Sequence, residues 1–329
     1  MGRPRSGTTL MSSLLDAHPS LTILPIETEV FSLWYARCVD HVRNHENSVS
    51  FWTFFAAKSR FPKLEIDRSE IIPDSDDTDP LSILSCMLTK MGEYDACRHN
   101  KTRWGEKTPI HYKSLPLVFK AYPQAQVLMM LRDPRAILAS LVKTPWNQET
   151  TEESARRWME YIRIMQNWGS DPRVRIIRFE ELVADTGRIL QDVCRWLGEE
   201  YTPAMLDRSH LSHRLKTKKG WGLEHRRKAL EPINAAGIGK WKEQLSPKQI
   251  KVTEHVCAPL MRQLGYEPVT SGLGLVRGAI LDMKGSILDM KESLDQKKIF
   301  SKSLRKGAAL FKKVILNPGR PVETSHSEK

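Results

Sequence analysis

The sequence predicts an α/β fold, a P-loop-type parallel sheet flanked by helices, with a helical C-terminal extension. Two apolar runs are typical of buried parallel strands: VLMML at 127–131 and VRII at 174–177, which continues to Phe179. The chain opens with a phosphate-loop spacing, and helical patterns alternate with the strand-like runs. We therefore expect one α/β domain over residues 1–268 and a separate region over residues 269–329.

Four helices are expected inside the α/β domain. Each has apolar residues at helical spacing, and two of them directly follow a loop or a Pro that can begin a helix. Their expected ranges are Leu10–Ala17, Arg135–Val142, 152–168 and 186–197.

The first segment, GRPRSGTT, has the glycine spacing of a phosphate-binding loop, but Thr8 stands where nucleoside triphosphatases have lysine. Such a loop still offers backbone N–H groups at a helix N-terminus, which bind anions. Arg5 adds a permanent cation, and Ser6 and Thr9 add hydroxyl donors. The missing lysine disfavours a P-loop kinase, as does the lack of a convincing Mg²⁺-binding aspartate at the end of a strand.

LRDPRAILAS at 131–140 provides a second candidate anion site. Arg132 ends an apolar strand and Ser140 lies about two turns along the next helix, so both side chains can converge on one further phosphate. The alternative interpretation makes Arg132 an ion-pair partner and Ser140 a small packing residue.

The net charge and the cysteine content exclude some kinds of site but do not identify the ligand. The net charge of +12 attracts polyanions of several kinds, and much of it lies in the C-terminal tail and in residues 214–228. That basic stretch is either a lid over a bound ligand or a solvated loop. The five cysteines are scattered and never in C-x-x-C spacing, which argues against a zinc site or a disulfide framework. A reducing, cytoplasmic compartment is therefore expected.

The C-terminal region contains two further patterns. A period of seven over residues 273–294 predicts either a homodimeric coiled coil or a single helix packed on its own domain. Residues 298–315 form a basic amphipathic pattern, which suits an anionic membrane surface as well as a core-packed helix with a solvated face. Residues 316–329 are expected to be disordered.

Taken together, RPRSGTTL and RDPRAILAS resemble the cofactor site of the sulfotransferases that use 3′-phosphoadenosine 5′-phosphosulfate (PAPS). GRPRSGTTLMSSLLDAHPS is especially similar to the branch containing the tyrosylprotein sulfotransferases and bacterial relatives, and the resemblance extends over residues 1–268. It implies PAPS as donor and no metal. It places Arg5, Ser6, Gly7, Thr8 and Thr9 around the 5′-phosphosulfate, and Arg132 and Ser140 on the 3′-phosphate.

The same resemblance suggests catalytic residues. WGEKTP at 104–109 is similar to a stretch whose lysine, here Lys107, stabilises charge on the leaving phosphate, a role that Arg5 shares. The acceptor hydroxyl needs a general base. Glu27, in PIETEVF at 25–31, is the match, one residue later than the family pattern; Glu29 and His111 are the alternatives.

Two later stretches resemble the family less closely. RFEELVAD at 178–185 carries Phe179 where the family usually has tyrosine. GIGKWKEQLSP at 237–247 is similar to an element that closes over the cofactor, which places Lys240 and Trp241 near the nucleotide.

The resulting expectation is an enzyme that transfers a sulfonyl group to a hydroxyl of a carbohydrate, small molecule or peptidyl tyrosine. The alternatives are a catalytically inactive nucleotide-binding scaffold and a P-loop kinase; nucleic acid is not an expected partner. Only Met1 precedes Gly2, so the strand that should lead into the loop is missing or truncated, or another segment replaces it. For a eukaryotic, truncated chain the expected location becomes the Golgi lumen.

Overall fold

The computed structural model describes most of the first 270 residues, and every described residue lies in the unit Met1–Thr270. The described ranges are 1–44, 48–58, 61, 66, 77–207 and 232–270. The predictions made for residues 214–228, 273–294, 298–315 and 316–329 lie outside the described residues, and the proposed domain boundary at residue 268 stays a prediction.

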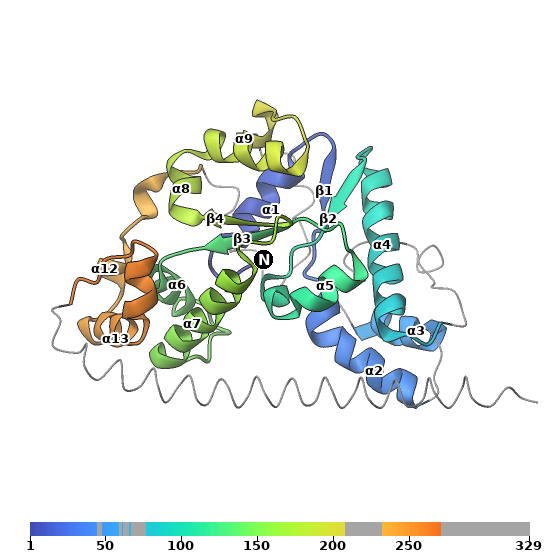
Figure 1. Ribbon diagram of the computed structural model, residues 1–329, viewed down its shortest axis with the longest axis horizontal. Coiled ribbons are helices and arrows are strands. Elements are labelled where there is room, and N and C mark those ends of the chain that lie inside the picture. Colours follow the sequence, from blue (N-terminus) through green and yellow to red (C-terminus); the bar gives the residue numbers. More distant parts are fainter. Residues whose placement is uncertain (45–47, 59–60, 62–65, 67–76, 208–231, 271–329) are drawn as a thin grey trace, which may run out of the picture. The chain divides into compact units, whose positions relative to one another are not determined.

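Within the described residues, short strands form two parallel pairs (Figure 1). β1 (Leu21–Ile23) pairs with β2 (Arg103–Gly105), and β3 (Val127–Leu131) pairs with β4 (Val174–Arg178), so the α/β class is confirmed. β3 occupies the predicted range. β4 ends one residue before Phe179, because Phe179 begins the next helix.

The predicted helices are present with small shifts of their ends. They are α1 (Thr8–Asp16), α6 (Pro134–Leu141), α7 (Thr151–Trp168) and α9 (Thr186–Leu197). Side-chain caps explain two starting points: Asp133 accepts from the N–H of Arg135, and Thr150 forms a capping box with Glu153. The described residues also form the α-helices α2 (Tyr35–Arg43), α3 (Ser48–Lys58), α4 (Pro80–Arg98), α5 (Leu115–Ala121), α8 (Phe179–Ala184), α12 (Trp241–Gln244) and α13 (Pro247–Gln263).

Helices cover β3 on both faces, so its side chains are buried on each side. Met129 and Leu131 pack in a cluster with residues of α5, α6, α7 and α13. Met130 points into another cluster, with residues of α1, α8 and α9. Figure 1 shows these two helix groups on opposite sides of β3 and β4. Because parallel strands covered on both faces need apolar side chains throughout, the uninterrupted run VLMML is explained.

The N-terminus lies between the two strand pairs (Figure 1). Gly2 forms an isolated parallel bridge with Met130. Walls from both pairs enclose a cavity of about 540 Å³, which is lined by Leu21 and Ile23 on one side and Leu128 and Met130 on the other. Within the described residues, the named strands are those of the two pairs, and the expectations about the first strand stay predictions.

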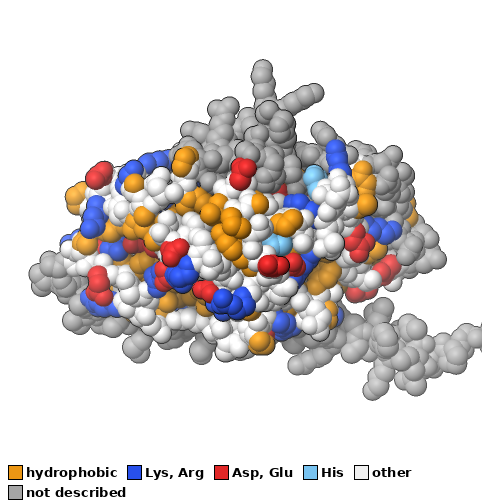
Figure 2. Space-filling model, turned by 90° about the horizontal axis from the view of Figure 1, so that it is seen from above, with side chains coloured by type: hydrophobic (Ala, Val, Ile, Leu, Met, Phe, Trp, Pro, Cys, Tyr) orange, Lys and Arg blue, Asp and Glu red, His pale blue; other side chains and the backbone are white. Residues whose placement is uncertain are grey.

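The described helices include none that combines the length and the apolar character needed to cross a membrane. Figure 2 shows basic and acidic side chains interspersed over one face of the described part. The positive charge is therefore not gathered into one patch on that face.

Candidate functional site

The phosphate-loop segment turns sharply into α1. Arg5 has φ 74° and Gly7 has φ 95°, both in the left-handed region. Gly7 is the N-cap of α1 and makes no side-chain cap, so the first-turn N–H groups have no intrahelical acceptor and face outward from the helix end. A Cβ on Gly7 would lie 2.3 Å from Cδ2 of Phe179, which explains why glycine is needed here.

A cavity of about 470 Å³ opens at this helix end. It is lined by all but one of the residues that the sequence assigned to the cofactor: Arg5, Gly7, Thr8, Thr9, Arg132, Ser140, Lys240 and Trp241. The remaining residue, Ser6, is fully buried beside the cavity. Segments as far apart in the sequence as those of Arg5 and Trp241 are thus brought to one site, although their role in binding stays a prediction.

Arg132 extends from the end of β3 into the site. Its Nη1 donates to the carbonyl oxygen of Arg5 at 2.7 Å, and its guanidinium carbon lies 4.0 Å from the centre of the Phe179 ring. Burial lowers the pKa of Arg132 to about 10. In the described part of the chain, no carboxylate is within ion-pair distance of Arg132, and its buried Nε has no hydrogen-bond partner. The guanidinium therefore has unused capacity to bind an anion.

The two predicted anion sites are adjacent. Nε of Arg5 donates to Oγ of Ser140 at 2.9 Å, which joins the loop to α6. Burial lowers the pKa of Arg5, because desolvation disfavours its charged form. Arg5, assigned to the 5′-phosphosulfate, thus reaches the residue assigned to the 3′-phosphate.

Sequence reasoning missed two residues that support this cavity. Phe179 fills the space behind Gly7 and stacks on Arg132. Arg135 lies 3.9 Å from the Trp241 ring centre and forms ion pairs with Asp133 at 2.8 Å and with Glu254 at 2.5 Å. The segment RDPR contained a signal for Arg135, since the Asp that can cap a helix stands two residues before the second arginine, within reach of its side chain.

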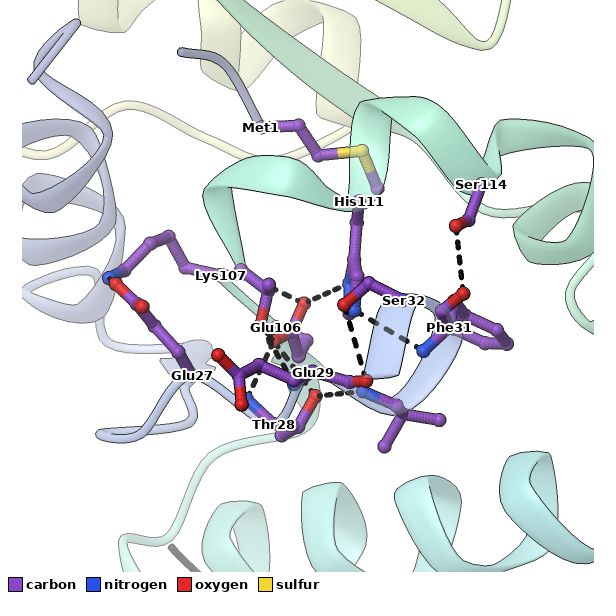
Figure 3. A network of polar contacts seen from close by, with 12 residues as sticks. Met1, Glu27, Thr28, Glu29, Phe31, Ser32, Glu106, Lys107, His111 and Ser114 are labelled. Atoms are coloured by element: carbon purple, nitrogen blue, oxygen red, sulfur yellow. Dashed lines mark hydrogen bonds and ion pairs between the residues drawn. The ribbon is translucent and has the colours of Figure 1, made fainter. Parts of the chain in front are cut away.

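Glu27 and Lys107 form an ion pair, with 2.5 Å between Oε1 and Nζ (Figure 3). Their side chains are 31% and 16% exposed, so the pair is reachable from solvent. Neither residue lines the 470 Å³ cavity; Lys107 lines the 540 Å³ cavity, and Thr8 lines both. The predicted base and the predicted lysine are therefore brought together, next to the cavity that contains the predicted cofactor residues.

The two alternative bases lie in the same region. The backbone N–H of Glu29 donates to Oγ1 of Thr108 at 3.2 Å. His111 is buried, with Nε2 accepting from the N–H of Phe31 at 3.3 Å and Nδ1 facing Glu106 at 3.1 Å (Figure 3). Because both ring nitrogens already have partners, His111 would have to break one bond to receive a proton from a substrate.

Glu106 is the third residue that sequence reasoning missed. Burial by itself raises the pKa of Glu106, but His111 and hydrogen bonds from Thr108 and Thr28 lower it to about 2. It is therefore a buried carboxylate ion at neutral pH. Within the described residues, no group of three or more potential metal ligands gathers.

Comparisons with known proteins agree with the motifs. The sequence pattern of the Sulfotransferase family matches residues 1–203. The chain is 24% identical over 275 residues to Protein-tyrosine sulfotransferase 1 of Danio rerio, covering 81% of this chain and 71% of that protein. It is 24% identical over 287 residues to the Protein-tyrosine sulfotransferase of Drosophila melanogaster, covering 81% of this chain and 51% of the relative.

Among solved structures, the chain is similar to a sulfotransferase domain from the curacin biosynthetic pathway, with a TM-score of 0.49 and 15% identity. That alignment covers 80% of this chain and 95% of the solved domain. Because the family pattern extends over more than half of the 329 residues and includes the loop, the lysine segment and Arg132, the chain belongs to the sulfotransferase family and is a sulfonyl-transferring enzyme.

Proposed function

We propose that this enzyme takes its sulfonyl group from PAPS, which binds in the 470 Å³ cavity, and transfers it to a hydroxyl acceptor. The observation that carries the proposal is the convergence on that cavity of eight residues assigned from separate motifs. No comparable convergence is expected if Arg132 and Ser140 were only packing residues.

The chemistry of the cavity fits this donor. One end offers the first-turn N–H groups of α1 and the hydroxyls of Thr8 and Thr9, which suit a phosphosulfate. Arg132 contributes a cation with an unpartnered Nε, which suits a second phosphate. Trp241 offers an aromatic surface on the same cavity.

The Glu27–Lys107 pair supplies the chemistry of transfer. The bound donor provides an electrophilic sulfonyl group attached to its 5′-phosphate. Glu27 accepts the proton of the attacking hydroxyl, and Lys107 stabilises the negative charge on the leaving phosphate oxygen. The 2.5 Å contact pairs the two side chains before substrates bind, and Lys107 moves from Glu27 to the phosphate oxygen as the reaction proceeds.

A tyrosyl hydroxyl is the acceptor class that the comparisons favour, because the similar curated proteins are named protein-tyrosine sulfotransferases. This step rests on sequence similarity at 24% identity and not on the geometry of an acceptor site. Carbohydrate and small-molecule hydroxyls are therefore tested alongside it.

Donor binding is tested by calorimetry with adenosine 3′,5′-bisphosphate and with ATP–Mg²⁺. We expect metal-independent binding of the bisphosphate by the wild type and a loss of roughly 10- to 100-fold in affinity in Arg132→Ala, since a charged hydrogen bond is removed. Arg195→Ala, which removes a guanidinium from a 78% exposed side chain, is the matched control and should bind as the wild type does. Preferential binding of ATP–Mg²⁺ would instead support a kinase.

Transfer is tested with PAPS carrying a labelled sulfonyl group. The acceptors are a tyrosine peptide, its phenylalanine analogue, an oligosaccharide and a simple phenol. Label on the tyrosine peptide and not on the phenylalanine analogue supports the tyrosyl acceptor. Tight binding of the bisphosphate without transfer to any acceptor would favour the inactive scaffold.

A further inference from the structure

Glu106 connects the two loops that carry the predicted catalytic pair. Its carboxylate accepts from the N–H of Thr28 at 3.2 Å and from Oγ1 of Thr28 at 2.9 Å. It also accepts from the N–H of Thr108 at 3.0 Å and from the Thr108 hydroxyl. Thr28 follows Glu27 directly in sequence, and Thr108 follows Lys107 directly.

His111 completes this connection. The N–H of Phe31 donates to Nε2 of His111, so Nε2 carries no proton and Nδ1–H donates to Glu106 at 3.1 Å. Phe31 lies in the π-helix Val30–Trp34, which follows the Glu27 loop. The Glu27 segment is therefore attached to the Lys107 segment at Thr28 and again at Phe31, both times through the Glu106 carboxylate (Figure 3).

We propose that Glu106 is a positioning residue that holds Glu27 against Lys107. The proposal rests on the proposed function, because it assigns the positions of those two catalytic groups to a third side chain. Two flexible side chains from segments 80 residues apart meet at 2.5 Å. A carboxylate that binds the backbone beside each of them fixes the spacing of both loops, and small misplacements in such groups reduce rates strongly.

The test is Glu106→Gln, which keeps the shape and removes one acceptor. We expect kcat for sulfonyl transfer from PAPS to fall about 10- to 100-fold, with the affinity for adenosine 3′,5′-bisphosphate unchanged, because Glu106 does not line the nucleotide cavity. Asp95→Asn is the matched control: Asp95 is a buried carboxylate that accepts from the Thr22 hydroxyl at 2.5 Å, and its loss should lower the melting temperature without changing kcat.

A double-mutant cycle separates positioning from general stability. Thr28→Val removes one hydroxyl that Glu106 binds, and its effect on kcat should be smaller than that of Glu106→Gln and not additive with it. If Glu106→Gln does not fold, Thr28→Val alone must still lower kcat at constant nucleotide affinity. If the wild type is active and neither substitution lowers kcat, the positioning role is overturned while the proposed function stands. If the wild type itself shows no transfer activity, the proposed function is overturned.

Discussion

The 470 Å³ cavity, which we propose binds the nucleotide, and the Glu27–Lys107 pair are built in different ways. Two of the cations that line the cavity, Arg5 and Arg132, belong to short contiguous motifs and lie just before α1 and α6. The pair takes its two members from segments 80 residues apart, and a buried carboxylate connects them. A local motif can specify the first arrangement, whereas only the tertiary fold specifies the second.

Because of this difference, we expect the two regions to affect different quantities: nucleotide affinity in one and the rate of sulfonyl transfer in the other. The cavity keeps donors and cations in place before a ligand arrives, so changes there should act on nucleotide affinity. The pair lies outside the cavity lining, so changes there should act on the chemical step at nearly constant affinity. Substitutions in the two regions therefore test whether nucleotide affinity and the rate of transfer are governed separately.

The largest effect is expected for Lys107→Ala. Removing the ammonium leaves the developing charge on the leaving oxygen without its stabilising partner, and we expect kcat to fall roughly 100- to 1,000-fold. Single-turnover transfer from PAPS measures the change, with the affinity for adenosine 3′,5′-bisphosphate measured in parallel. Lys113→Ala is the control, because Lys113 is an exposed lysine paired with Glu160. A large loss of nucleotide affinity in Lys107→Ala would show that the two regions are not separate.

The next effect is expected for Gly7→Ala. The added Cβ would lie 2.3 Å from Cδ2 of Phe179, and the alanine would have to adopt φ 95°. We therefore expect the free energy of unfolding to fall by about 1–3 kcal/mol and the nucleotide to bind more weakly. Thermal unfolding and calorimetry measure both. Gly237→Ala is the matched control, because Gly237 lines the same cavity and its Cβ would meet nothing within 4 Å. Unchanged nucleotide binding in Gly7→Ala would contradict a role for the loop conformation.

The same contrast explains what could be predicted from the sequence. β3 was predicted in full because five consecutive apolar residues leave few alternatives, whereas β1 and β2 have three residues each and no periodicity to detect. Arg132 and Ser140 were identifiable because their motif is contiguous. Glu106 was not, because its importance arises from Thr28 and His111, which only folding brings to it. Phe179 was noticed only as a departure from the family, although it supports both Gly7 and Arg132.

The smallest effect is expected for Ser140→Ala, and it tests the point where the two predicted anion sites meet. The substitution removes one neutral hydroxyl and the acceptor of the Arg5 Nε–H bond, so we expect the affinity for adenosine 3′,5′-bisphosphate to fall about three- to tenfold. Thr144→Val is the control, because the Thr144 hydroxyl donates to the carbonyl oxygen of Leu141 outside the cavity. A change in kcat at constant affinity would mean that Ser140 acts through Arg5 on the transferred group. The cavity would then contribute to rate as well as to binding, and the contrast between the two regions would no longer hold at Arg5.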